Sequence, residues 1–244
     1  MYQKIKLNFS VLAFSMLLSA GCNATATEFA PYFNKDNQSG AFFDNALILK
    51  SASDFSSALE KNWDYPTDLK HKTLGKKSVS SCQQLKKSIN DGFTAAKVYE
   101  HKFVSAQSTI CSLWKHMAAF KAYKISHLGE LPLNKDFAKQ APASLALVIS
   151  DEQEKKVKMA ASWNDFSKIK KVTSHSKTKS TFYDNSGGIQ RLSLMAKGDY
   201  NGDGIEDRLL FMENSVEGGS YSSTNAYIIT RVSPGAPITL LKEI

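Results

Sequence analysis

The chain has 244 residues, 42% of them hydrophobic and 11% aromatic, which is enough apolar material for a sizeable core and excludes an intrinsically disordered chain. The formal net charge is +8, but only three of the 31 basic residues are arginines and the lysines are dispersed. Because bidentate phosphate recognition favours arginine, no nucleic-acid partner is expected.

The N-terminus has the pattern of an export signal. Lys4 and Lys6 give a positive start, and an apolar run over residues 7–18 follows, ending in three small residues before Cys22. A membrane-spanning helix needs about 20 apolar residues, so this run is too short to act as an anchor by itself. Residues 1–21 are therefore predicted to be a signal peptide.

Residues 17–22, LLSAGC, resemble the lipobox of bacterial lipoproteins, although Ser19 stands where an aliphatic residue is commoner. The resemblance implies cleavage before Cys22 and acylation of its thiol, with palmitate as a typical chain. Acyl chains would hold the mature protein on a membrane as a peripheral lipoprotein. The alternative is an ordinary leader cut after Ala26, at the A-x-A site formed with Ala24, which would leave a soluble periplasmic or secreted protein.

By resemblance to enteric lipoproteins, Asn23 after the cysteine implies sorting to the outer membrane, facing the periplasm or the surface. Twelve lysines against four acidic residues lie between positions 61 and 124. Solvated helix faces are the preferred interpretation of this excess. If the excess of positive charge instead serves binding, the expected partner is an anionic lipid or glycan, or an envelope protein.

The mature chain is expected to begin with a flexible tether, residues 22–45, followed by a helical region, residues 46–130. Ser53 is predicted to cap a short helix over residues 54–61. Ser81 and Gln84 form a capping box for a helix that ends at Gly92. Apolar residues at intervals of three and four then predict a long amphipathic helix over residues 95–123.

Two cysteines remain if Cys22 carries lipid. Cys82 begins the first helix of the predicted hairpin and Cys111 lies within the second, so antiparallel packing brings them together. In an oxidising compartment the pair is expected to form a disulfide. Neither cysteine has the spacing of a zinc site or a histidine beside it.

Residues 131–244 are predicted to form an α+β region. Asn134 is suited to capping a short helix, whereas the apolar residues 144–150 fit either a strand or a helix start. From residue 181 onward, alternating apolar segments separated by glycine or proline turns predict an antiparallel meander. The fold class expected is α+β, a disulfide-stapled helical half followed by a small antiparallel sheet.

The most specific motif lies in GDYNGDGIEDRLLF, residues 198–211. Oxygen ligands at alternate positions of a tight loop suit a hard cation such as Ca²⁺, and the central glycine permits the sharp turn. The predicted ligands of one structural Ca²⁺ ion are the side chains of Asp199, Asn201, Asp203 and Asp207 and the backbone carbonyl of Ile205. The alternative is a polar turn without metal.

The loop resembles the calcium loops of FG-GAP and related β-propeller repeats, in which the loop joins two strands. It resembles the EF-hand less well, because Leu210 occupies the position of the bidentate glutamate. A propeller needs several repeats and only one copy is present, so the resemblance implies the ligands and not the fold.

No catalytic residue is assigned, because the five histidines are scattered and no HExxH or GxSxG motif occurs. The preferred hypothesis is a non-catalytic envelope lipoprotein, a binding or envelope-maintenance module with a structural calcium loop. The alternatives are an envelope hydrolase acting on cell-wall or lipid substrates and a calcium-dependent surface adhesion module. A deep pocket with converging histidine and carboxylate groups would favour the hydrolase.

Overall fold

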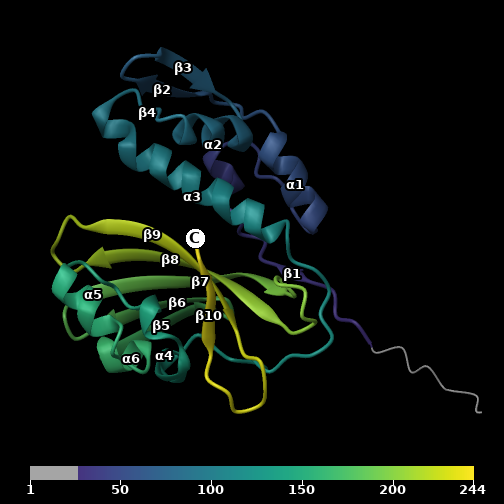
Figure 1. Ribbon diagram of the computed structural model, residues 1–244, viewed down its shortest axis with the longest axis vertical. Helices are drawn as coiled ribbons and strands as arrows, with labels where there is room; N and C mark the ends of the chain where they lie inside the picture. The colour runs from purple at the N-terminus through teal and green to yellow at the C-terminus, as the bar shows by residue number, and fades with distance from the viewer. Residues whose placement is uncertain (1–26) are drawn as a thin grey trace, which may run out of the picture.

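The computed structural model describes residues 27–244 (Figure 1). The predicted signal peptide, Cys22, Asn23 and the alternative cleavage site at Ala26 lie outside these residues. Within residues 27–244, no helix is long and apolar enough to cross a membrane.

Residues 27–244 form six α-helices and three 3₁₀ turns. The helices are α1 (Ala52–Glu60), α2 (Cys82–Asn90), α3 (His101–Met117), α4 (Lys135–Gln140), α5 (Asp151–Val157) and α6 (Trp163–Phe166). The 3₁₀ turns are η1 (Ser39–Ala41), η2 (Val98–Glu100) and η3 (Ala143–Leu145).

The ten strands in the described part of the chain belong to two antiparallel sheets. They are β1 (Tyr32–Phe33), β2 (Thr67–His71), β3 (Gly75–Val79), β4 (Thr94–Ala95), β5 (Ile169–Ser176), β6 (Lys179–Asp184), β7 (Gly188–Gly198), β8 (Asp207–Val216), β9 (Ser222–Thr230) and β10 (Thr239–Glu243). The small sheet has the order β3-β2-β4, and the large one the order β10-β9-β8-β7-β6-β5, with β1 added against β7. The α+β class and the meander are therefore confirmed, although the large sheet begins at Ile169, earlier than predicted.

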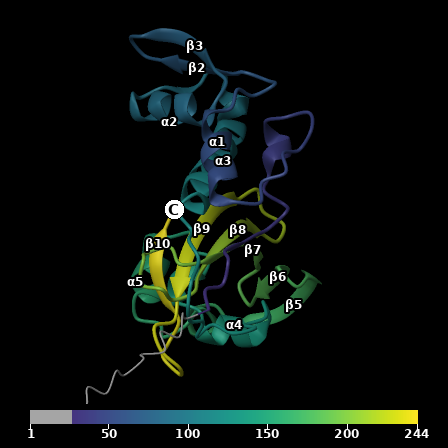
Figure 2. The same ribbon diagram turned by 90° about the vertical axis from the view of Figure 1, so that its right-hand side faces the viewer.

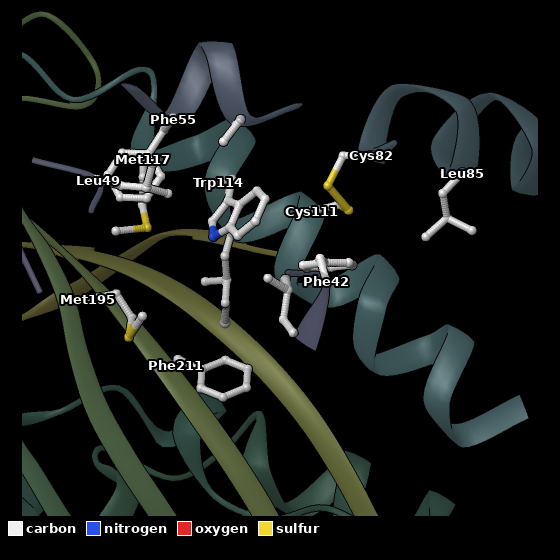
Figure 3. Close-up of a cluster of buried hydrophobic side chains, with 14 of the residues drawn as sticks. Phe42, Leu49, Phe55, Cys82, Leu85, Cys111, Trp114, Met117, Met195 and Phe211 are labelled. Atoms are coloured by element: carbon white, nitrogen blue, oxygen red, sulfur yellow. A yellow bond between two sulfur atoms is a disulfide. The ribbon is translucent and has the colours of Figure 1, made fainter. Parts of the chain in front are cut away.

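The disulfide between Cys82 and Cys111 is present, with the two Cα atoms 5.3 Å apart. It joins the first residue of α2 to the middle of α3 (Figure 3). The Ser81 hydroxyl accepts a hydrogen bond from the Gln84 amide and caps α2, as predicted. The Gln84 side chain instead accepts from the Ser80 amide, so the capping box is shifted by one residue on that side.

The large sheet is buried on both faces, which explains the unbroken apolar run in β8. Leu209 and Phe211 pack into the core that the sheet shares with α1, α2 and α3. Leu210 and Met212 point to the opposite face and pack with α4, α6 and η3. Figures 1 and 2 show the sheet between α1–α3 on one side and α4–α6 on the other.

The first core contains the largest aromatic cluster. Trp114 of α3 is fully buried and its indole nitrogen donates a hydrogen bond to the Asn37 carbonyl at 2.8 Å. In Figure 3, Met195 and Phe211 of the sheet lie across from Trp114 and Met117 of α3. The helical half and the sheet therefore share one core.

Three predicted elements differ from the structure. The long helix is only His101–Met117, because residues 94–100 form a strand pair and a 3₁₀ turn before it. Tyr99 and Phe103, assigned to its apolar stripe, are 76% and 52% exposed. The first helix starts two residues early and is capped by Ser51, not Ser53, because Ser51 bonds the Asp54 amide. Residues 146–150 are neither strand nor helix.

The predicted tether, residues 22–45, is packed over its second half. β1 pairs with β7, and Phe33, Phe42 and Phe43 are buried in the first core. The Asn, Ser and Gly content of this segment suggested a mobile linker. The aromatic residues within it instead hold residues 32–45 against the fold, because each aromatic side chain can bury about 150–250 Å² of surface.

Candidate calcium-binding loop

The loop predicted to bind Ca²⁺ closes the hairpin between β7 and β8, the two central strands of the large sheet. β7 ends at Gly198 and β8 begins at Asp207, and these two residues are paired in the sheet. The strand-loop-strand context is therefore confirmed. Gly202 and Gly204 have φ angles of 87° and 80°, a left-handed conformation that favours glycine.

Asp199 organises the turn from within. Its Oδ1 accepts hydrogen bonds from the amides of Gly202 at 2.6 Å and Asp203 at 3.2 Å, and its Oδ2 accepts from the Gly204 amide at 2.8 Å. The residue is only 5% exposed. The chain thus wraps around this carboxylate and holds it at the centre of the loop.

Asn201 and Asp203 lie on the exposed side of the loop. Asn201 Oδ1 accepts from the Asp203 amide at 3.1 Å, and Asp203 Oδ1 accepts from the Ile205 amide at 2.8 Å. The Asn201 side-chain amide donates to Asp203 Oδ2 at 2.9 Å. Successive side chains therefore turn their oxygens toward the inside of the loop.

Among the predicted ligands, Asp207 is the carboxylate whose negative charge is least favoured by its surroundings. It is fully buried; its Oδ2 accepts from the Tyr200 amide at 2.9 Å, but within residues 27–244 its Oδ1 has no hydrogen-bond partner. Burial raises the pKa of Asp207 to about 6, and the negative charges of Asp203 and Asp199 contribute to the rise. The Thr230 hydroxyl, opposite Asp207 on β9, and the Tyr200 amide each lower the pKa of Asp207 and so partly offset the effect of burial.

The five predicted ligands are thus close in the chain and within one loop, but their side chains do not form a preassembled carboxylate cage. Among residues 27–244, no three His, Cys, Asp or Glu side chains converge in a way that would hold a metal. Besides the three carboxylates, the predicted ligands are the side-chain oxygen of Asn201 and the backbone carbonyl of Ile205. In the described part of the chain, the Ile205 carbonyl accepts no hydrogen bond.

A strap of extended chain, residues 121–131, holds the loop from outside. Lys121 and Asp199 exchange two backbone hydrogen bonds of 2.9 Å, and the Lys124 amide donates to the Gly204 carbonyl at 2.8 Å. The approach is so close that a Cβ at Gly198 would lie 2.6 Å from the Lys121 carbonyl oxygen. Glycine is therefore required at that strand end.

A buried ion pair ties the same strap to the start of β8. Arg208 Nε donates to Glu206 Oε1 at 2.7 Å, and both side chains are only 4% exposed. The other guanidinium nitrogens donate to the carbonyls of Gly129 and Leu131. These hydrogen bonds from all three guanidinium nitrogens help to offset the free-energy cost of burying both charges.

The loop also contacts α3 through a histidine that the sequence did not single out. His116 Nδ1 and the Tyr200 hydroxyl lie 2.8 Å apart, and His116 is 8% exposed. Burial lowers the pKa of His116 to about 4, assisted by the positive charges of Lys242, Lys115 and Lys86. No motif spacing links positions 116 and 200, so only the fold could reveal this contact.

One cleft in the structure contains both a histidine and a carboxylate. A cleft of about 630 Å³ between α3 and the ends of β7, β8 and β9 is lined by both His101 and Glu213. Glu213 Oε2 lies 3.7 Å from Arg191 Nη1. In the described part of the chain, no histidine is hydrogen-bonded to an Asp or Glu side chain, so the cleft holds no base-and-orienter pair of the usual kind.

No protein-family model, curated protein or solved structure matches this chain.

Proposed function

We propose that this chain is an exported cell-envelope lipoprotein whose folded part is a non-catalytic binding module stabilised by one Ca²⁺ ion in the β7–β8 loop. The observation that carries the calcium assignment is Asp207. A buried carboxylate with one unpartnered oxygen, close to two other carboxylates, is unfavourable unless a cation or a proton neutralises it.

A calcium ion suits this loop better than a proton at neutral pH. Ca²⁺ takes six to eight oxygen ligands, including carboxylates, amides and backbone carbonyls, in flexible geometry. Asp199, Asn201, Asp203 and Asp207 would supply side-chain oxygens and Ile205 its carbonyl. Asp199 Oδ1 already accepts two backbone hydrogen bonds, but Oδ2 accepts only one, so its second lone pair can bind a cation.

The expected role of the ion is structural. β7 and β8 contribute to both cores, so ordering their connection would stabilise the whole sheet. With Leu210 in place of a bidentate acid, we expect a dissociation constant of roughly 0.1–1 mM, in the range of extracellular modules.

Calorimetry of calcium binding tests the assignment. Residues 27–244 contain both cores, the disulfide and every described strand and helix, so they can be exported and purified as a unit. Asp203→Asn keeps an acceptor for the Ile205 amide but removes the charge, and should weaken binding at least tenfold.

Asp184→Asn is the matched control. Asp184 also caps a tight turn between neighbouring strands, accepting from the amides of Ser186 and Gly188, but it lies in the β6–β7 connection. This variant should bind calcium like the parent protein. Equal weakening in both variants would mean that general destabilisation, and not a lost ligand, causes the effect.

The proposed anchor is a lipid on Cys22. LLSAGC at the end of the short apolar run supports acylation and an outer-membrane location. Replacing Cys22 with Ser should abolish incorporation of a labelled fatty acid in cells that express the full chain. Unchanged labelling would contradict acylation at Cys22. A parent protein that takes up no label and is cleaved after Ala26 would instead be free in the periplasm or outside the cell.

A hydrolase is the second candidate, favoured by the cleft that contains His101 and Glu213. If it were correct, turnover of a cell-wall or lipid substrate would disappear in His101→Ala while the melting temperature stayed close to that of the parent. An anionic lipid or glycan, or an envelope protein, remains the proposed partner of the non-catalytic module.

A further inference from the structure

A second cavity lies on the helical half of the molecule. It has a volume of about 490 Å³ and is formed by α1, α2 and α3. This size falls within the range of about 300–1,000 Å³ that is typical of small-molecule sites. None of the proposed calcium ligands lines this cavity.

Much of the cavity wall is apolar. Leu59 of α1 and Leu85 and Ile89 of α2 line it, together with the Cys82–Cys111 disulfide. Leu85 is fully buried, whereas Ile89 is 36% exposed. Figure 3 shows the disulfide and Leu85 on neighbouring parts of α2 and α3. The disulfide fixes the spacing of these helices, so the cavity is held open by a covalent link and not by side chains alone.

Two exposed lysines stand at the rim of the cavity. Lys86 of α2 and Lys115 of α3 line the cavity, and Glu60 is the one acidic residue among its lining residues. In the part of the chain that the structure describes, neither lysine forms an ion pair. Lys87, the neighbour of Lys86, behaves differently: it lies outside the cavity and pairs with Asp91 at 2.8 Å.

The two ammonium groups act on one another. The close approach of Lys115 lowers the pKa of Lys86, and the charge of Lys242 at the end of β10 adds to the effect. Like charges held together without a counterion are unfavourable, and a bound anion would remove that cost. The two lysines therefore favour a ligand that places a negatively charged group at this edge of the cavity.

We propose that the cavity between α1, α2 and α3 binds a single-chain anionic amphiphile. Its carboxylate or phosphate lies between Lys86 and Lys115, and its acyl chain lies against Leu59, Leu85, Ile89 and the disulfide. Both a fatty acid and a lysophospholipid have this chemistry, and a cell envelope contains both. The proposal does not depend on calcium binding or on Cys22.

Calorimetry with defined probes tests this site on residues 27–244, which carry no lipid of their own. Dodecanoate and dodecyl phosphate, each below its micelle concentration, represent the two headgroups. We expect saturable binding of one molecule per chain for at least one of them. Dodecyl maltoside supplies an uncharged headgroup, and inorganic phosphate supplies an anion without a chain; both should bind at least tenfold more weakly.

Variants assign the binding to this cavity. Lys86→Gln and Lys115→Gln should each weaken amphiphile binding about tenfold or more, because each removes a charge-assisted contact. Lys87→Gln is the matched control on the same helix and should bind like the parent. Ser112→Phe fills the cavity from α3 and should block the amphiphile, while circular dichroism and the oxidised disulfide report that the variant is folded.

The preferred probe identifies the source of the ligand. Tighter binding of dodecanoate indicates a free fatty acid, and tighter binding of dodecyl phosphate indicates a phosphate-bearing lipid. Equal binding of inorganic phosphate and dodecyl phosphate would overturn the proposal, because the chain would then contribute nothing. Binding that is the same in Lys86→Gln, Lys115→Gln and Lys87→Gln would overturn it as well.

Discussion

Asp207 is the residue on which the calcium assignment depends most closely. Its carboxylate is buried, lacks one hydrogen-bond partner and feels the charges of Asp199 and Asp203. In the calcium-free protein the negative charge is therefore destabilising. In the calcium-bound protein the same charge would be a ligand.

These two roles predict effects of opposite sign for Asp207→Asn. Without calcium at pH 7, the variant should have a higher free energy of unfolding by on the order of 1 kcal/mol, a value discounted for solvent screening. The amide oxygen can still accept from Tyr200. With millimolar calcium, the variant should gain no stability while the parent does. Urea unfolding with calcium or chelator measures both effects, and a variant less stable than the parent in chelator would contradict the argument.

His116 gives a prediction for the pH dependence of stability. Its pKa is about 4 in the folded protein and 6.5 in the unfolded chain, because burial and the charges of Lys242, Lys115 and Lys86 disfavour the protonated form. Between these values the unfolded state binds more protons, so stability falls as the pH falls from 6.5 toward 4. His116→Gln removes the titrating group, and its melting temperature should fall less steeply over this range. Parallel pH profiles in chelator would refute the prediction.

At the scale of elements, the disulfide is the main constraint on the helical half. Cys82 and Cys111 are separated by 29 residues, and closing a loop of this length restricts the unfolded chain. Replacing both cysteines with Ala should lower the free energy of unfolding by about 3.5 kcal/mol in the chain-entropy model. Urea unfolding of the exported parent and the double variant measures the difference. A loss below about 1 kcal/mol would show that α2 and α3 are held mainly by packing.

The strap at residues 121–131 is predicted to depend on the buried Glu206–Arg208 pair. Arg208→Met leaves Glu206 buried without its counterion and should cost about 3–5 kcal/mol in the free energy of unfolding. The double variant Glu206→Leu with Arg208→Met removes both charges and should recover most of that loss. Chemical denaturation of the four proteins of this cycle provides the test. If the double variant loses as much stability as Glu206→Leu and Arg208→Met lose together, the two residues do not stabilise the fold as an ion pair.

Local signals predicted the elements that local interactions determine. Ser81 and Asn134 cap α2 and α4 as expected, because a side chain bonding an amide two or three residues ahead depends only on nearby sequence. The strands around Leu210 and Ile228 were recognisable from their apolar runs. The loop from Asp199 to Asp207 was identified from the spacing of its oxygen ligands.

Features that depend on distant segments could not be predicted in this way. β1 forms only because β7 lies beside it, and η1 carries Phe42 into a core built from three other parts of the chain. The contact of His116 with Tyr200 and the pairing of Arg208 with the Gly129 carbonyl join residues more than 75 positions apart. No periodicity or spacing encodes such contacts, since they follow from the packing of whole elements.

At the scale of the whole molecule, the large sheet connects two cores that lie on its opposite faces. One face packs on α1, α2 and α3, and the other on α4, α6 and η3. The β7–β8 loop sits at the end of the two central strands, and the strap, which runs between α3 and α4, is hydrogen-bonded to it. An ion that orders this loop would therefore act on the stability of the entire fold.

The most direct test of the central claim is the melting temperature of residues 27–244 with calcium and with chelator. For a site of roughly 0.5 mM affinity, 5 mM calcium adds about 1.4 kcal/mol, which corresponds to a rise of about 3 °C in a chain of this size. The account predicts this rise for the parent and Asp184→Asn and a rise of at most about 1 °C for Asp203→Asn. It also predicts a smaller effect of magnesium, which prefers a tighter octahedral site. A parent melting temperature that does not respond to calcium, or a response that Asp203→Asn retains in full, would contradict it.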